Sequence, residues 1–292
     1  MSSVAASPSV ASAVPTRARR PSTLTVYRWE LRKLVSQKRT YLGLGLIVIL
    51  PLVFVAVENV HQRHRGGGKS VFAREITKSG LATPVLILTF LVLFMLPLVA
   101  TLVAGDIVAN EDGNGTLKTI LTRSVDRGQV FVAKGLAAMT YATIAVYLSA
   151  VVGTVAGVAS WGFHPLTSLS GTVVSAPEAL LLVFAANAIY LIPLLAVVSI
   201  GLLLSTATRN SAAAVVGTIG LVIVLDIVSG IPGLEGIRPY LLTQQFEAWQ
   251  GLLRTPTDWA PIAHSAWVCG LYAMPALFAA YLTFLRRDVA GG

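Results

Sequence analysis

The sequence predicts an all-α polytopic membrane protein with six transmembrane helices, an N-terminal interfacial helix and a short helix between the second and third spans. Apolar residue types make up 55% of the 292 residues, and charged residues only 12%. A soluble domain usually has about 25% charged residues. The charges are also clustered, so six uncharged runs approach or exceed the ~20 residues that cross a bilayer.

The N-terminal 40 residues divide into two parts. Residues 1–21 are rich in Ala, Ser, Pro and Arg without apolar periodicity, which predicts a disordered tail. Residues 22–40 predict an amphipathic interfacial helix on an anionic membrane face, since apolar and basic residues occupy different sides. The apolar positions are Leu24, Tyr27, Leu31, Leu34 and Val35, and the basic ones are Arg28, Arg32, Lys33 and Lys38.

Residues 41–288 form the predicted transmembrane domain. Its spans are expected at about 41–57, 84–104, 130–158, 179–204, 212–229 and 265–285. Pro51, Pro97 and Pro193 lie inside three of these spans, where proline kinks or interrupts a helix. Residues 58–80 are expected to form a polar loop. In the loop 230–263 a second interfacial helix is expected near 243–254, with Phe246, Trp249 and Leu253 on one face and a place in an outer gate.

The distribution of basic residues predicts the orientation. If the six spans alternate, one side holds 15 Lys and Arg residues and the other holds 7. Cytoplasmic loops carry the excess of Lys and Arg, so both termini and the stretch 105–138 are expected in the cytoplasm. The five basic residues of the loop 58–80 run against this rule. The net charge of +9 is explained by basic residues that flank the spans, so a nucleic-acid partner is not expected.

The stretch 105–138 is the longest polar passage between two apolar segments. Thr116 can cap a short helix in which Leu117, Ile120 and Leu121 share a face, so that this helix would lie flat on the membrane surface. The next helix is expected to begin at Asp126, with Gln129 three residues later as in a capping box. The first turn of the third span, including Lys134, is expected to project into the cytoplasm.

Three acids, Asp106, Glu111 and Asp112, open this stretch. They could ligate a metal or relay protons. Alternatively, acids beside a small amphipathic helix could form a docking surface for a basic groove on a soluble partner.

Other candidate chemistry is weak. The fragment 66–70, GGGKS, imitates the end of a P-loop, but it lacks the preceding glycine and apolar strand, so this chain is not expected to hydrolyse ATP. His61 and His64 lack nearby carboxylates or thiolates for a metal site, and no metal is expected. The single cysteine, Cys269, excludes a disulfide within the chain. Gly153 and Gly157 form a GxxxG pair that allows close helix approach.

Asp226 lies within the apolar run of the fifth span, so it is a candidate for the transport pathway or the outer gate. It could bind a proton, a cation or a polar substrate group. The alternative is that it sits near the outer end of the span and reaches water or Arg238. No second intramembrane aspartate accompanies it, so an aspartyl intramembrane protease is not supported.

The region from about residue 23 to residue 287 resembles ABC-2-type transporter permeases, the membrane subunits of ATP-driven exporters. The resemblance rests on the amphipathic helix before the first span, the six spans, the passage SGIPGLEGIRPYL after the fifth span, and the string 105–138. Within that string, the pattern E-x-x-x-GT-L-K-x-x-L-(T/S)-R is matched by Glu111, Gly115, Thr116, Leu117, Lys118, Leu121, Thr122 and Arg123. The family usually has proline after this arginine, where Ser124 stands here.

The resemblance implies a coupling helix that docks into a separate ATPase subunit. The coupling residues would be Glu111, Gly115, Thr116, Leu117, Lys118, Leu121 and Arg123. Two copies of an ATP-binding subunit would carry ATP and Mg, while this chain would bind no cofactor itself. A second permease chain, expected to be identical, would complete the pathway. The location implied is the bacterial inner (cell) membrane, in contact with the lipid bilayer and with no nucleic acid.

Two other classes of function compete with the exporter subunit. A secondary transporter would normally carry several buried ionisable groups and an internal repeat, whereas this chain has one candidate, Asp226, and no convincing repeat. A membrane scaffold that transports nothing would not need a patterned coupling helix.

Overall fold

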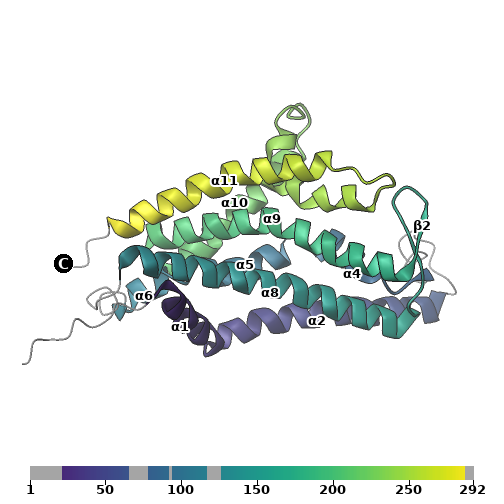
Figure 1. Cartoon of the computed structure of the whole chain (residues 1–292), viewed down its shortest axis with the longest axis horizontal. Helices are drawn as coiled ribbons and strands as arrows, with labels where there is room; N and C mark the ends of the chain where they lie inside the picture. The colour runs from purple at the N-terminus through teal and green to yellow at the C-terminus, as the bar shows by residue number, and fades with distance from the viewer. Residues whose placement is uncertain (1–21, 66–77, 92–93, 117–125, 287–292) are drawn as a thin grey trace, which may run out of the picture.

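Long helices lie side by side along the longest axis of the molecule (Figure 1). The computed structural model describes residues 22–65, 78–91, 94–116 and 126–286. Within these ranges, five helices are long and apolar enough to cross a membrane, which confirms an all-α, multi-pass membrane fold. They are α2 (Lys38–Arg65), α8 (Arg127–Trp161), α9 (Ala176–Thr208), α10 (Ser211–Ser229) and α11 (Ala260–Leu285).

The second predicted span, 84–104, is the one not confirmed as a single helix. It forms two ten-residue helices, α4 (Ala82–Leu91) and α5 (Met95–Ala104). Pro97 gives the physical reason. In a helix interior, proline has no N–H to donate to the carbonyl group four residues earlier, and its ring clashes with that carbonyl group. In the first turn of a helix neither problem arises, so proline is tolerated there. Pro97 lies in the first turn of α5.

The helix ends gather at two ends of the bundle. Arg127 at the start of α8 donates to the Leu285 carbonyl at the end of α11 (3.1 Å). At the opposite end, the Gly80 N–H before α4 bonds the Gly162 carbonyl after α8 (3.1 Å). Helix α1 (Thr23–Val35) and the end of α11 lie at the same end of the bundle (Figure 1). That this end faces the cytoplasm stays a prediction.

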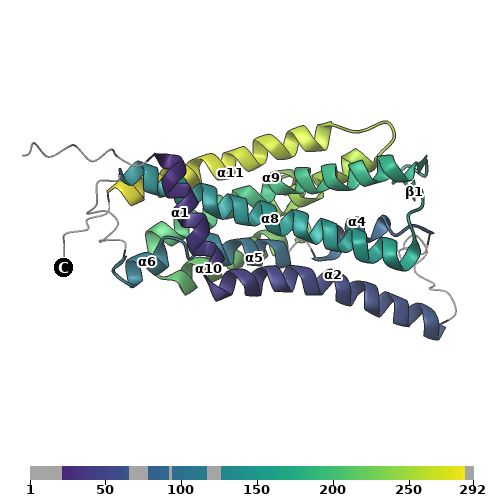
Figure 2. The same cartoon turned by 60° about the horizontal axis from the view of Figure 1, so that its bottom comes forward.

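Helix α1 runs obliquely across the long helices (Figure 2). Ser22 caps its first turn by accepting a bond from the Thr25 N–H (3.3 Å). The helix ends at Val35, and α2 begins at Lys38. The predicted amphipathic segment 22–40 is therefore shorter than expected, because its last three residues belong to the first membrane-length helix.

Two loop predictions need correction. Residues 58–65 continue α2 rather than joining a polar loop. The segment near 243–254 forms a 3₁₀ helix, η2 (Leu242–Leu253), preceded by η1 (Arg238–Tyr240). A 3₁₀ helix repeats every three residues, so Phe246 and Trp249 share a row. Both are buried, and the Phe246 ring lies 5.0 Å from the Tyr190 ring of α9, so this row faces the protein rather than a membrane surface.

The only strands among the described residues form a small hairpin between α8 and α9. Strand β1 (Leu166–Thr167) pairs antiparallel with β2 (Val173–Val174). The Leu169 N–H in the hairpin turn donates to the Leu253 carbonyl of η2 (3.0 Å). This contact ties the hairpin to the 3₁₀ segment at the end of the bundle opposite α1.

The GxxxG pair in α8 lies against α4 and the turn before it, as expected. A Cβ atom added to Gly157 would lie 2.3 Å from the Gly80 carbonyl oxygen, and one added to Gly153 would lie 3.0 Å from Ile87. The absence of side chains at both glycines therefore lets these segments approach α8 closely.

Replacing Gly157 by alanine is expected to lower the free energy of unfolding by about 1–3 kcal/mol, because the methyl group meets backbone that cannot move aside. The effect would be measured by thermal unfolding in detergent. Gly270→Ala in α11 is the matched control, since no atom lies within 4 Å of its added Cβ. Equal stability of the two variants would contradict the close approach.

Candidate functional site

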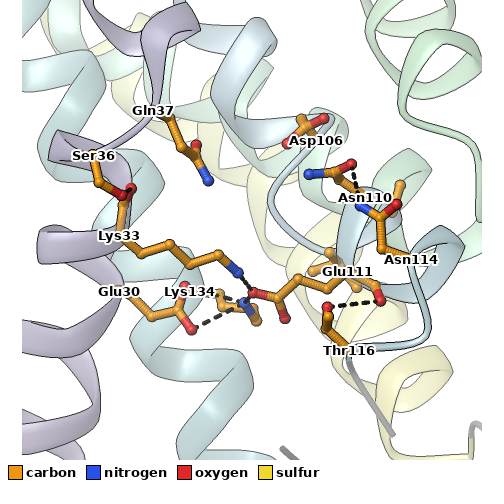
Figure 3. Close-up of polar contacts among 12 residues, drawn as sticks. Glu30, Lys33, Ser36, Gln37, Asp106, Asn110, Glu111, Asn114, Thr116 and Lys134 are labelled. Carbon is orange, nitrogen blue, oxygen red and sulfur yellow. Dashed lines mark hydrogen bonds and ion pairs between the residues drawn. The ribbon is translucent and has the colours of Figure 1, made fainter. Parts of the chain in front are cut away.

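Four charged side chains meet between α1, α6 (Ala109–Gly113) and α8 (Figure 3). Lys134 of α8 donates to both carboxylate oxygens of Glu30 in α1 (3.0 and 3.1 Å). Its Nζ atom also lies 2.6 Å from Oε1 of Glu111 in α6. Lys33 of α1 pairs with the same Glu111 oxygen. We call Glu30, Lys33, Glu111 and Lys134 the ion cluster.

The local sequence explains how these side chains come to face one another. Val26, Glu30 and Leu34 are spaced four residues apart, so they form the buried row of α1. Lys134 lies on the buried face of α8, among Val130, Ala133, Ala137, Ala138 and Tyr141. Tyr27 joins Thr140 by a hydrogen bond of 2.8 Å, which fixes the row of α1 against α8.

Two further ion pairs extend the contact to α2, α9 and α10. Asp106 pairs with Arg39 of α2 and accepts a 2.5 Å bond from the Ser211 hydroxyl of α10. Asp112 lies 3.7 Å from Arg209, which follows α9. The backbone around α6 is held as well, because the N–H groups of residues 108 and 109 both donate to the Ser205 hydroxyl (3.3 and 3.0 Å).

The ion cluster is electrically balanced, and three of its four side chains are buried; Lys33 is partly exposed. The Lys134 side chain is fully buried, and Glu111 is only 3% exposed. Two acids and two bases leave the cluster without net charge. Burying each ionised group costs several kcal/mol, and only good pairing geometry offsets this cost, so a buried ion pair adds little net stability. Removing one partner is strongly destabilising, because the other charge is then buried without compensation. The cluster therefore fixes where α6 sits relative to α1 and α8.

The structure changes the interpretation of the acids at 106–112. The described residues contain no group of three His, Cys, Asp or Glu side chains that could hold a metal. Asp106 and Glu111 are buried and paired with cations, so in this conformation neither carboxylate is an exposed docking surface. Lys134, in the turn expected to project into the cytoplasm, is buried among apolar neighbours on α8 and is neutralised by two acids. The side of the membrane on which it lies stays a prediction.

The predicted coupling residues are only partly described. Glu111 belongs to the ion cluster, and the Thr116 hydroxyl donates to its carbonyl oxygen (3.2 Å). Gly115 has φ +69°, a left-handed conformation that favours glycine. Leu117, Lys118, Leu121 and Arg123 lie outside the described residues, as does the helix that Thr116 was expected to cap. Asp126 does precede α8 as its N-cap residue, but its side chain makes no capping bond.

Sequence reasoning missed the partners of Glu111 and Lys134. Glu30 is the sole acid in the segment 22–40, and it lies four residues from the apolar Val26 and Leu34, on the same face of α1. Lys134 similarly interrupts an apolar face of α8. A single charge on each of two apolar faces, with opposite signs, is the signal that could have paired them.

Asp226 lies one turn before the end of α10. Its side chain is half-buried, and among the described residues no ion pair involves its carboxylate. Nearby, the pKa of Glu235 is lowered because the Gly233 N–H donates to its exposed carboxylate (3.0 Å).

Asp226→Asn is expected to be tolerated, because no cation in the described part of the chain depends on this charge. The amount of protein in the membrane and its melting temperature in detergent should match those of the unmodified chain. If the substitution abolished activity at normal abundance, Asp226 would belong to the pathway instead.

These observations define a multi-pass α-helical membrane protein. Its buried charged residues, among those described, lie at one end of the bundle. The family described as "Protein of unknown function (DUF2705)" matches residues 42–290, and the chain belongs to this family. No curated protein matches the chain.

Proposed function

We propose that this chain is the permease subunit of an ATP-driven exporter in the bacterial cell membrane, with both termini in the cytoplasm. It would form the substrate pathway together with a second, identical chain. Two copies of a separate ATP-binding subunit, carrying ATP and Mg, would dock on the segment 111–123. Closure of these subunits on ATP would push on that segment and re-pack the spans.

The ion cluster carries this proposal. Glu111 is the first residue of the proposed coupling segment, and Lys134 connects it directly to α8. Lys33 connects it to α1. A displacement of the segment would therefore move charged partners on both helices, and buried ion pairs do not tolerate intermediate, half-broken arrangements. This is the kind of rigid connection that a subunit driven by an external ATPase needs.

The positions of the buried charges also favour this proposal over a secondary transporter. In the described residues, the buried acids are Glu30, Asp106 and Glu111. All three lie at one end of the bundle and are paired with cations. A proton- or ion-driven carrier would place such groups near the middle of the membrane.

Co-purification tests the proposal. The tagged chain would be recovered from native membranes in mild detergent, its partners identified by mass spectrometry, and its ATPase activity measured. A stoichiometric P-loop ATPase with vanadate-sensitive activity is the expected result. Repeated recovery of the chain alone, from membranes where it is abundant, would favour a secondary transporter or a scaffold.

A further inference from the structure

Three exposed cations, two on the outward face of α1 and one at the start of α2, have no acidic partner among the described residues. Arg28, Arg32 and Lys38 are exposed, and no acid in the described part of the chain pairs with them. By contrast, Lys33 on the other side of α1 pairs with Glu111, and the buried Lys134 pairs with Glu30 and Glu111. On α1, the cation paired with an acid, Lys33, therefore lies on a different side from Arg28 and Arg32, which pair with no described acid.

Large apolar side chains share this outward face. Leu24, Trp29 and Val35 are 56%, 52% and 59% exposed. Leu24, Arg28 and Arg32 are spaced four residues apart and form one row, with Trp29 beside it. Cations alternating with an exposed tryptophan and aliphatic side chains are typical of the boundary between headgroups and acyl chains. A face turned wholly to water would leave the tryptophan without a favourable environment.

The orientation of α1 is fixed by its other face. Tyr27 and Glu30 attach it to α8, and only two residues separate its end from the start of the membrane-length helix α2. Helix α1 consequently lies at the level where α2 begins and runs across the bundle (Figure 2). If α2 crosses a bilayer from its first residue, the arginines of α1 would lie at the depth of the lipid headgroups of that leaflet.

We infer that the outward face of α1, formed by Leu24, Arg28, Trp29, Arg32 and Val35, binds anionic phospholipid headgroups together with Lys38 at the start of α2. The guanidinium groups would donate to the phosphate oxygens, which Arg recognises well. Trp29 and the aliphatic side chains would contact the upper acyl chains. Since the inward face of the same helix holds Glu111 through Lys33, bound lipid would also steady the ion cluster.

Lipid titration of the purified full chain tests this inference independently of any ATPase. The chain in mild detergent is titrated with phosphatidylglycerol or phosphatidylcholine, and bound lipid is counted by native mass spectrometry. We expect a preference for phosphatidylglycerol. In the variant R28Q/R32Q its apparent affinity should fall by about 30-fold, since each basic side chain beside an anionic lipid surface contributes about a factor of five. R28K/R32K keeps the charge and should keep most of the affinity.

The matched control is R238Q/R254Q, which removes the same charge at the opposite end of the bundle and should leave lipid affinity unchanged. The inference is overturned if the unmodified chain shows no preference, if R28Q/R32Q retains it, or if the control loses it equally. A chain without lipid preference whose R28Q/R32Q variant loses a protein partner would assign this face to that protein. The exporter proposal would then stand while the lipid proposal failed.

Discussion

Lys134→Met is expected to lower the free energy of unfolding by about 3–5 kcal/mol, the loss that follows when a buried ion pair keeps one charge and loses the other. Lys134 is fully buried, and it is the cation that neutralises Glu30. Methionine matches its length without its charge, so the loss reports electrostatics rather than a cavity. Thermal unfolding of the purified chain in detergent would measure the effect.

A double-mutant cycle separates this explanation from a general packing defect. Glu30→Gln/Lys134→Met removes both charges, and Glu111 retains Lys33, so most of the lost stability should return. Lys33→Met serves as the control with a smaller expected loss of about 1 kcal/mol, because its side chain is 40% exposed and Glu111 keeps Lys134. Additive losses in the double variant would show that Glu30 and Lys134 do not interact.

Replacing Leu117 and Leu121 together by aspartate is expected to abolish stimulation of the partner ATPase while the chain stays in the membrane. Burying each leucine side chain against the partner would contribute about 1.5–3 kcal/mol, and a charged replacement adds a desolvation penalty. The measurement compares ATPase activity of the complex and the amount of chain in the membrane.

The control variant is Leu169→Asp/Val173→Asp, which makes the same chemical change at two exposed positions in the hairpin at the other end of the bundle. It should leave ATPase stimulation intact. Normal stimulation in the Leu117/Leu121 variant would remove the coupling assignment, whatever the control shows.

The long helices were predictable because uncharged runs of membrane length leave few alternatives. The end of α2 was predicted too early, because the polar residues 58–65 were expected to form a loop. They instead continue a helix already formed by apolar residues. The type of helix in the segment 242–253 could not be predicted from periodicity, because the spacing of Phe246 and Trp249 suits both an α-helix and a 3₁₀ helix. The packing of these rings on the bundle decides between them, and that packing joins residues far apart in the sequence.

In the ion cluster, Glu111 was predictable as a site residue, but Glu30 and the geometry of the cluster were not. Glu111 stood out because of its place in the resemblance to permeases. Its partners Lys33 and Lys134 come from helices before and after it, and only tertiary packing brings them within bonding distance. Lys134 illustrates the difficulty, since a lysine near a helix start is ordinarily placed in water. Here burial is compensated by two acids from other helices.

The most direct test of the exporter proposal is a photo-crosslink from Lys118, at the centre of the proposed coupling segment. A photoreactive residue is placed at this position, membranes from the native host are irradiated, and adducts are identified by mass spectrometry. Trp259, which is exposed at the other end of the bundle, is the control position. The proposal predicts an adduct with a P-loop ATPase from position 118 and none from 259. Efficient irradiation of abundant chain with no ATPase adduct from position 118 would contradict it.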